Sequence, residues 1–184
     1  VHVFGNSVDL NNKFIKLCRK KNIRIIEDAA ESVGTYYKYN GKKNHSGTIG
    51  DLGCLSFNGN KIATSGGGGM ILTKNKSLFS KAKYLSTQAK DNANFFIHNE
   101  VGFNFRLSNI HSAIGKAQIE KLNIILKKKK RINIFYKKGI NKIKGLKIMD
   151  NPSYSDSNNW LNILFVDEKR YGLSKNMIMK KFIK

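Results

Sequence analysis

Short apolar runs with strand character alternate with segments of helical spacing along the first part of the chain. Residues 23–28 form a β-branched run that ends on two acidic side chains, and residues 52–57 and 70–73 read as two further strands. Residues 9–18 carry apolar side chains at helical spacing before the first of these strands. A helix followed by a strand that ends on a carboxylate is typical of an α/β sheet, so the pattern predicts this fold class.

The expected elements continue along the rest of the chain, and three helices have recognisable starts. Asp9 is the expected cap of the first helix, Ser108 caps a helix that continues through residue 126 toward 135, and Ser174 begins a final helix. The other expected elements are a strand end at 1–4, a hairpin at 36–44 with the turn dipeptide Asn40-Gly41, a helix at 77–85, and strands at 146–149 and 160–166.

The loop between the strands 52–57 and 70–73 contains small residues, one lysine, Lys61, and a run of four glycines at 66–69. Glycines permit positive φ and the close approach of another group. A lysine held near apolar strand ends loses part of its hydration, which favours the neutral, nucleophilic amine. The same residues also fit an ordinary turn in a chain with 34 lysines and arginines, so the loop alone leaves both interpretations open.

Asp28 stands at the carboxyl end of the strand expected at 23–28. Ligands of α/β sheets bind beyond the carboxyl ends of the strands, which makes Asp28 a candidate ligand-binding residue. Ala29-Ala30-Glu31 follows, so Asp28 also fits the N-cap of a helix, and the pattern does not choose between the two roles.

The composition limits the class of protein. The chain has 184 residues, of which 40% are hydrophobic, enough for the core of one ordinary domain. A net charge of +22 fits nucleic-acid binding, but the basic residues are spread over polar helix faces, and even the dense run 127–131 reads as a solvated face. No RNA-binding or zinc-finger motif is present, and no apolar run is long enough to span a bilayer. Cys18 and Cys54 are expected to be buried free thiols, and a zinc site would need more ligands at closer spacing.

Five stretches of the chain form a recognisable set when they are taken in order and at their spacing. They are Val1-His2-Val3-Phe4-Gly5-Asn6, Glu27-Asp28-Ala29-Ala30-Glu31-Ser32-Val33-Gly34, Gly50-Asp51, Ser56-Phe57-Asn58-Gly59-Asn60-Lys61 with its glycine run, and Gly102-Phe103-Asn104-Phe105-Arg106-Leu107-Ser108-Asn109-Ile110. Together they resemble the DegT/DnrJ/EryC1/StrS sugar aminotransferases, which use pyridoxal 5′-phosphate. The resemblance implies a type I aminotransferase fold, with a three-layer α/β/α large domain on a mostly parallel sheet and part of a smaller α+β C-terminal domain.

The resemblance also implies a role for several residues. Lys61 would form the Schiff base with the cofactor aldehyde and then shuttle a proton. Asp28 would keep the pyridine nitrogen protonated, which makes the cofactor an electron sink. Ser56 would donate its hydroxyl to the cofactor phosphate, and Ala30 would lie against one face of the ring. A related branch that dehydrates sugars has histidine in place of the lysine, so Lys61 favours transamination.

Three further residues follow from the same resemblance. Glu31 stands where many members carry glutamine, near the phenolic oxygen of the cofactor, and is expected to share a proton with that oxygen. Asn104 would reach the cofactor phosphate of the neighbouring subunit, which implies a homodimer with shared active sites. Arg106 would contact the substrate or the active site of the partner.

The implied activity is transfer of an amino group, with glutamate as the expected donor, to C4 of a nucleotide-linked 4-keto-6-deoxy sugar. Residues 58–61, 66–69, 86–90 and 97–100 look most like the enzymes that act on UDP-linked N-acetylated sugars, on the way to bacillosamine or legionaminic acid in surface glycans. The alternatives are an inactive piece of that fold and, less favoured, a basic nucleic-acid-binding protein.

The resemblance further implies how the chain is organised. Residues 1–140 are expected to form part of the cofactor-binding domain with a long connecting helix, and residues 141–184 part of the small domain. The chain is expected to be truncated at both ends, to lack a signal peptide, to be cytoplasmic, and to bind neither metal, membrane nor nucleic acid.

Overall fold

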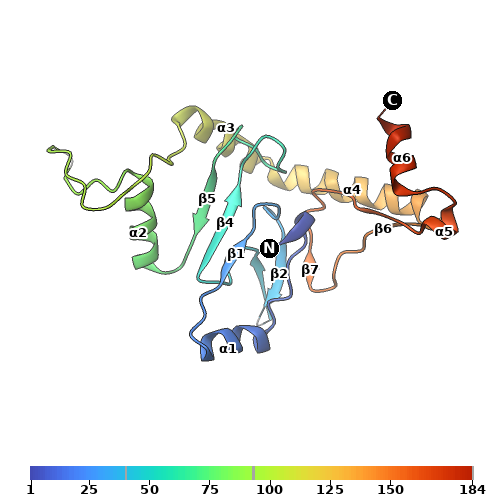
Figure 1. The fold of residues 1–184 in the computed structure, drawn as a ribbon, viewed down its shortest axis with the longest axis horizontal. Helices are drawn as coiled ribbons and strands as arrows, with labels where there is room; N and C mark the ends of the chain where they lie inside the picture. The colour runs from blue at the N-terminus through green and yellow to red at the C-terminus, as the bar shows by residue number, and fades with distance from the viewer. Residues whose placement is uncertain (40, 93, 184) are drawn as a thin grey trace.

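The computed structural model describes residues 1–39, 41–92 and 94–183. In Figure 1 the strands β1, β2, β4 and β5 lie in the middle of the molecule, α1 and α2 lie beside them, and the long helix α4 leads toward β6 and the C-terminal helices. The elements are η1 (Val3–Gly5), α1 (Asn12–Lys20), β1 (Ile26–Asp28), β2 (Tyr36–Tyr39), β3 (Lys42–His45), β4 (Leu52–Ser56), β5 (Gly69–Leu72), α2 (Lys76–Ser86), α3 (Asn109–Glu120), α4 (Leu122–Ile140), β6 (Leu146–Ile148), β7 (Ser155–Asp156), β8 (Leu164–Val166), α5 (Glu168–Tyr171) and α6 (Lys175–Phe182).

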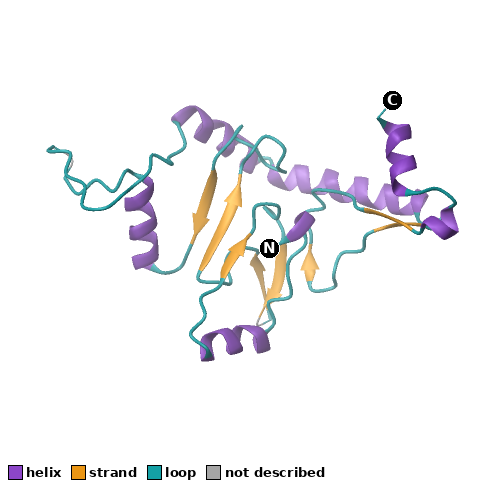
Figure 2. Cartoon of the chain, viewed as in Figure 1, coloured by secondary structure: helices purple, strands orange, loops and turns teal. Residues whose placement is uncertain are grey.

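β4 is the central strand of a three-stranded sheet, with β1 parallel on one side and β5 antiparallel on the other (Figure 2). Asp28 lies opposite Cys54 in the parallel pair, and Cys54 lies opposite Ile71 in the antiparallel pair. Side chains alternate between the two faces along a strand, and paired residues share a face. Asp28, Cys54 and Ser56 therefore lie on one face of the sheet. The three strands predicted from the apolar runs are confirmed.

A second sheet, in the order β3-β2-β7, brings a late segment of the chain back to an early one. β2 and β3 form the predicted antiparallel hairpin. Its turn includes Gly41 at φ +70°, whereas Asn40 lies outside the described residues. β7 pairs with β2, with Ser155 opposite Tyr37. Residues past the expected domain boundary at 140 thus pack on the first part of the chain, and the boundary itself stays a prediction.

The core nearest the lysine loop is built from segments far apart in the sequence. Its buried members are Val33, Phe57, Ile62, Ala63 and Trp160. Leu122, Ile125 and Leu126 of α4 pack against this cluster, together with Leu55 of β4. The lysine loop is therefore held between β4, the helix α4 and the segment around residue 160.

Several element ends differ from the sequence predictions. Residues 1–4 are not a strand end, because Val3–Gly5 forms a short 3₁₀ turn in which Phe4 has φ +54°. Asn11, not Asp9, caps α1 by accepting a hydrogen bond from the Phe14 N–H, and the Asp9 carboxylate instead accepts one from the Tyr37 hydroxyl at 2.6 Å.

The C-terminal half also shows differences. The helix predicted from Ser108 toward 135 is two helices, α3 and α4, separated by Lys121, whose backbone leaves helical geometry at φ −94° and ψ 1°. Ser108 and Ser174 do cap α3 and α6 as expected. The strand predicted at 160–166 is confined to β8, because Trp160 is buried in the core instead.

The two cysteines have different environments. Cys18 is buried, as predicted, but Cys54 is exposed, so the prediction for Cys54 is wrong. Cys54 lies on the face of β4 that it shares with Ile71, and Ile71 is itself 54% exposed. Among the described residues, no helix has the length and apolar character needed to cross a membrane, and none of their His, Cys, Asp and Glu side chains group into a metal-binding cluster.

His45 joins two loops through both nitrogens of its ring. Nε2 accepts a hydrogen bond from the Gly34 N–H at 2.9 Å, and Nδ1 donates to the Ser46 carbonyl at 2.5 Å. Burial disfavours the imidazolium and lowers the pKa of His45, although the bond to Ser46 partly opposes this shift. The nitrogen that faces the Gly34 N–H must stay unprotonated for this arrangement to hold.

We expect the free energy of unfolding to fall as the pH drops below about 6.5, the ordinary pKa of histidine, because the unfolded chain then binds a proton that folded His45 resists. The measurement is the urea midpoint of the intact gene product from about pH 8 to about pH 5, compared with a His45→Asn variant that has no imidazole to titrate. The variant should lose less stability over this range than the natural sequence. Parallel declines would contradict the prediction.

Candidate functional site

Asp28 and Ser56 lie at the carboxyl ends of two neighbouring strands. The sheet ladder continues past Asp28, since the Ala29 N–H donates to the Cys54 carbonyl at 2.9 Å. Asp28 Oδ1 accepts a hydrogen bond from the Ala30 N–H at 3.1 Å. Residues 29–35 form turns, so the helix-cap interpretation of Asp28 is wrong and its carboxylate stands at an open sheet edge.

The loop that carries Lys61 leaves β4 and returns to β5 within a network of backbone hydrogen bonds. Phe57 is bonded on both sides, from its N–H to the Gly68 carbonyl at 3.0 Å and from its carbonyl to the Ser65 N–H at 2.9 Å. The Lys61 N–H donates to the Asn58 carbonyl at 3.0 Å. Because Ile62 next to Lys61 is buried in the core, the loop is fixed, and Lys61 has a defined position rather than a mobile one.

The glycine run lets this loop close tightly against a neighbouring segment. Gly68 has φ +78°, and a Cβ at this position would lie 2.2 Å from Leu107 Cδ2. A side chain here would therefore be strained by its backbone and would clash with Leu107. Gly68 is therefore needed for the close approach of Leu107 to the lysine loop.

The side chain of Lys61 is held between a carboxylate and an aromatic ring. Its Nζ lies 3.9 Å from Glu31 Oε1 and 4.5 Å from the centre of the Trp160 ring. The Lys61 side chain is only 14% exposed. The other oxygen of Glu31 accepts a hydrogen bond from the Phe4 N–H at 2.7 Å, which fixes the carboxylate. Lys61 thus lies beside the loop that follows Asp28, at the same end of β1 and β4.

Two residues of this arrangement, Asn158 and Trp160, were not predicted as site residues. The Asn158 side-chain amide donates to the Glu31 and Val33 carbonyls at 3.0 and 2.9 Å. Its side-chain oxygen accepts from the Trp160 N–H at 2.9 Å. The one signal in the sequence was a single tryptophan directly after a pair of asparagines, and nothing local connects that signal with Lys61.

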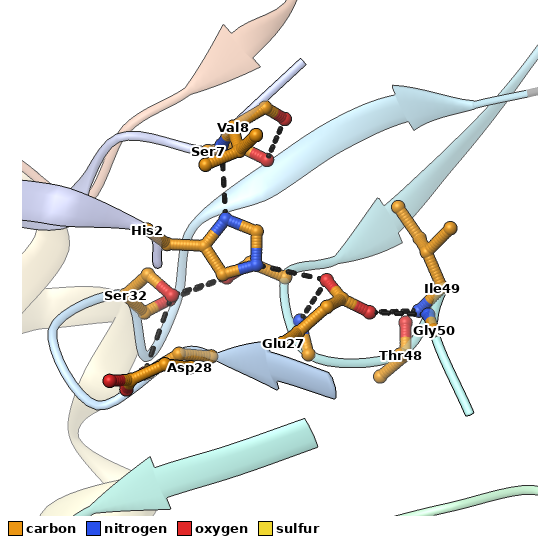
Figure 3. A network of polar contacts seen from close by, with 12 residues as sticks. His2, Ser7, Val8, Glu27, Asp28, Ser32, Thr48, Ile49 and Gly50 are labelled. Carbon is orange, nitrogen blue, oxygen red and sulfur yellow. Dashed lines mark hydrogen bonds and ion pairs between the residues drawn. The ribbon is translucent and has the colours of Figure 1, made fainter. Parts of the chain in front are cut away.

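Behind Asp28, a buried hydrogen bond between Glu27 and His2 fixes β1 from the opposite face. Glu27 and His2 are 3% and 2% exposed, and Glu27 Oε2 lies 2.9 Å from His2 Nε2. His2 Nδ1 accepts a hydrogen bond from the Val8 N–H at 3.0 Å, so Nε2 must carry the proton and donate to Glu27. Figure 3 shows the Glu27 carboxylate turned toward His2 and the Asp28 carboxylate turned away from this pair.

Glu27 also holds the loop that precedes β4. Its two oxygens accept hydrogen bonds from the N–H groups of Gly47, Ile49 and Gly50 at 2.8, 2.6 and 2.6 Å (Figure 3). Burial opposes ionisation of Glu27, but the hydrogen bonds from His2 and from these three N–H groups outweigh burial, and its pKa lies below the ordinary value. The ionised carboxylate therefore ties β1, the 47–50 loop and the N-terminal residues together.

Asn104 and Arg106 lie on a segment separate from this cluster. Asn104 forms an isolated bridge with Thr87, and the Phe105 N–H donates to the Ser86 carbonyl at 3.1 Å. Both Asn104 and Arg106 are exposed. The structure thus groups Asp28, Ala30, Glu31, Ser56 and Lys61 at one end of the sheet, whereas Asn104 and Arg106 lie beside the end of α2.

The chemistry of this group of side chains fits pyridoxal phosphate. Lys61 offers a primary amine, Asp28 a carboxylate and Ser56 a hydroxyl, which suit an aldehyde, a protonated ring nitrogen and a phosphate. Among the described residues, Asp28 Oδ2 has no hydrogen-bond partner and Lys61 Nζ has none within 3.5 Å. Both groups are therefore available to a ligand.

Comparison with known proteins places this arrangement in a family. The sequence matches the DegT/DnrJ/EryC1/StrS aminotransferase family over residues 1–184. EpsN of Bacillus subtilis is 39% identical over 181 residues, which is 98% of this chain and 45% of EpsN. A GDP-perosamine synthase of Caulobacter vibrioides is 41% identical over 136 residues, which is 74% of this chain and 35% of that protein.

The fold agrees with a solved structure from the same group. PseC of Helicobacter pylori, an aminotransferase involved in the biosynthesis of pseudoaminic acid, superimposes with a TM-score of 0.86 at 24% identity, over 99% of this chain and 48% of PseC. The aminotransferase fold expected from the sequence is confirmed. The chain spans less than half the length of each of these three proteins.

Proposed function

Because the chain belongs to the DegT/DnrJ/EryC1/StrS aminotransferase family, we propose that the protein transfers an amino group from glutamate to C4 of a nucleotide-linked 4-keto-6-deoxy sugar, with pyridoxal phosphate as its cofactor. The observation that supports this most directly is the position of Lys61, whose amine lies beside the loop after Asp28 at the end of the strand that carries Ser56. The carboxylate of Asp28 and the hydroxyl of Ser56 lie at the carboxyl ends of β1 and β4, and the loop that carries Lys61 follows β4 directly.

The side chains of the chain itself would do most of the positioning. Pyridoxal phosphate, when bound, supplies an electron-accepting ring that stabilises negative charge on the carbon bearing the amino group. Lys61 supplies the amine that holds the cofactor, and its Nζ takes up and returns a proton. Asp28 keeps a proton on the ring nitrogen, and the Ser56 hydroxyl donates to the phosphate. Ala30, on the loop after Asp28, offers a small apolar surface to the ring.

The remaining proposed roles concern the substrate and a second subunit. Glu31, beside Lys61, would face the phenolic oxygen of the cofactor. Asn104 and Arg106 are exposed and lie outside the cluster, which suits residues that act on the active site of a partner. We therefore include a homodimer with shared active sites in the proposal.

The names of relatives support the class of substrate. A GDP-perosamine synthase is among the relatives more than 40% identical over the shared part, which supports a nucleotide-linked sugar. The UDP nucleotide and the N-acetylated sugar rest on the sequence resemblance at residues 58–61 and 86–90. The nucleotide is therefore best determined by assay.

The test is a panel assay of the intact gene product. After addition of pyridoxal phosphate, the protein is expected to gain a visible absorption band and to convert a UDP-linked 4-keto-6-deoxy sugar, with glutamate, into the amino sugar and 2-oxoglutarate. GDP-linked and dTDP-linked 4-keto sugars serve as the comparison, with the product identified by mass spectrometry. Conversion of only the GDP-linked sugar would overturn the UDP assignment, and absence of both the band and any amino sugar would overturn the proposed function.

A further inference from the structure

Trp160 contacts both the backbone and the side chain of the lysine loop, although it is 100 residues away in sequence from Asn60. Its indole N–H donates to the Asn60 carbonyl at 2.9 Å, directly before Lys61. The face of the same ring lies 4.5 Å from Lys61 Nζ. One side chain therefore fixes the peptide that precedes Lys61 and also the amine at the end of the Lys61 side chain.

The ring limits where the amine can go. A lysine side chain has four rotatable carbon–carbon bonds, so holding it in one conformation costs conformational entropy. An indole face attracts an ammonium group, more strongly where water is partly excluded. Because the Lys61 side chain is only 14% exposed, the Trp160 face and Glu31 confine the amine to the space between them.

Trp160 is itself held in the same frame as Glu31. The backbone N–H of Trp160 donates a hydrogen bond to the side-chain oxygen of Asn158. The side-chain NH₂ of Asn158 in turn donates to the Glu31 carbonyl. The Trp160 carbonyl accepts a hydrogen bond from Lys129 Nζ of α4 at 2.9 Å. The indole ring is therefore fixed relative to the loop that carries Glu31 and to the helix behind it.

We propose that Trp160 is the positioning residue for Lys61, holding its amine toward the end of the sheet where the cofactor binds. This inference rests on the proposed function for its purpose, but the contact can be tested without the cofactor. An amine that is shielded by the indole reacts slowly with small electrophiles in solution, while it stays correctly placed for a bound aldehyde. Loss of the ring should thus change these two reactions in opposite directions.

The experiment compares Trp160→Leu, which removes the ring, with Trp160→Phe, which keeps a ring face but removes the indole N–H. The cofactor-free intact gene product is treated with acetic anhydride, and modification of Lys61 is followed by peptide mass spectrometry. Lys116, whose side chain is 79% exposed, provides the reference rate within the same sample. Trp160→Leu is expected to speed Lys61 modification about tenfold, and Trp160→Phe about threefold at most.

The second measurement is attachment of pyridoxal phosphate, followed by the visible band and by borohydride trapping. Trp160→Leu is expected to slow attachment about tenfold or more, and Trp160→Phe by about fivefold, the effect of one lost hydrogen bond. Ile15→Ala is the control for lost core packing, because Ile15 belongs to a second buried cluster that contains neither Trp160 nor a residue of the lysine loop. This control should destabilise the protein without changing the rate of Lys61 acetylation or the rate of pyridoxal phosphate attachment.

The outcomes separate the two proposals. Faster modification and slower attachment in Trp160→Leu, with both rates unchanged in Ile15→Ala, would support the positioning role. Unchanged Lys61 modification in Trp160→Leu, or equal changes in Ile15→Ala, would overturn it, since Trp160 would then act only as part of the core. A further outcome is that neither the natural protein nor any variant attaches pyridoxal phosphate, while Trp160→Leu still speeds the acetylation of Lys61. That result would overturn the proposed function but would support the contact between Trp160 and Lys61.

Discussion

Replacing Lys61 by arginine is expected to abolish the borohydride-trapped adduct with pyridoxal phosphate and to lower transamination by about a thousandfold or more. Arginine keeps the positive charge, so it can still face Glu31 and the Trp160 ring. Its guanidinium stays protonated in proteins and cannot act as an amine nucleophile. The substitution therefore removes the chemistry while it retains the electrostatic contacts, and the trapped peptide is identified by mass spectrometry.

The chain offers a matched control for this substitution. Lys81 also lies between a carboxylate and an aromatic ring, since its Nζ contacts Glu100 and lies 5.4 Å from the centre of the Tyr84 ring. Lys81→Arg should leave the adduct and the rate unchanged, because this pair lies on the surface of α2 outside the candidate site. An adduct that survives in Lys61→Arg would show that another lysine holds the cofactor, and it would remove the main support for the proposed function.

Replacing Glu27 by glutamine is expected to cost about 2 to 3 kcal/mol of the free energy of unfolding, because it leaves buried groups without their hydrogen-bond partners. The amide nearly matches the carboxylate in volume, but it offers a single acceptor oxygen. Its NH₂ group would face N–H donors that now bond to the carboxylate, from His2 and from the 47–50 loop. Unfolding in urea measures the loss, which is a large part of the usual 5–15 kcal/mol of a domain.

Glu120→Gln is the matched control, since Glu120 is 64% exposed and its nearest cation, Lys116, is 4.0 Å away. It should change stability by less than about 1 kcal/mol. The difference between Glu27→Gln and the natural protein should also shrink in acid. Because the pKa of folded Glu27 is lowered, its contribution is complete above about pH 4.3 and is lost as the pH falls through the folded value. A difference independent of pH would contradict the role assigned to the carboxylate.

Features that depend on residues close together in the sequence could be predicted from the sequence. The strands β1, β4 and β5, the caps Ser108 and Ser174, and the loop around Lys61 all follow from local composition and spacing. The burial of Cys54 was predicted wrongly. The alternation of side chains along a strand shows which residues share a face of the sheet, but it does not show whether other elements cover that face. Asp9 was misplaced as a cap because the competing Tyr37 hydroxyl comes from another part of the chain.

Contacts between segments far apart in the sequence could not be predicted from the sequence. The ring of Trp160 reaches Lys61 only because β7 pairs with β2 and the following residues continue into the core. His2 gave no sign of its bond to Glu27, since a lone histidine near the start of the chain has no local partner. The positions proposed to carry the chemistry were named from the sequence and their roles stay predictions, whereas the residues that hold them in place required the structure.

The long separation between Lys61 and Trp160 has a consequence for biosynthesis. A ribosome adds residues one after another, so the amine emerges well before the indole that shields it, and the two can meet only after about a hundred further residues have been made. During that interval the nascent chain presents the lysine to the solvent. The surroundings of Lys61 are thus among the last parts of this region to be completed, and a stalled or shortened translation product would hold the amine without the indole beside it.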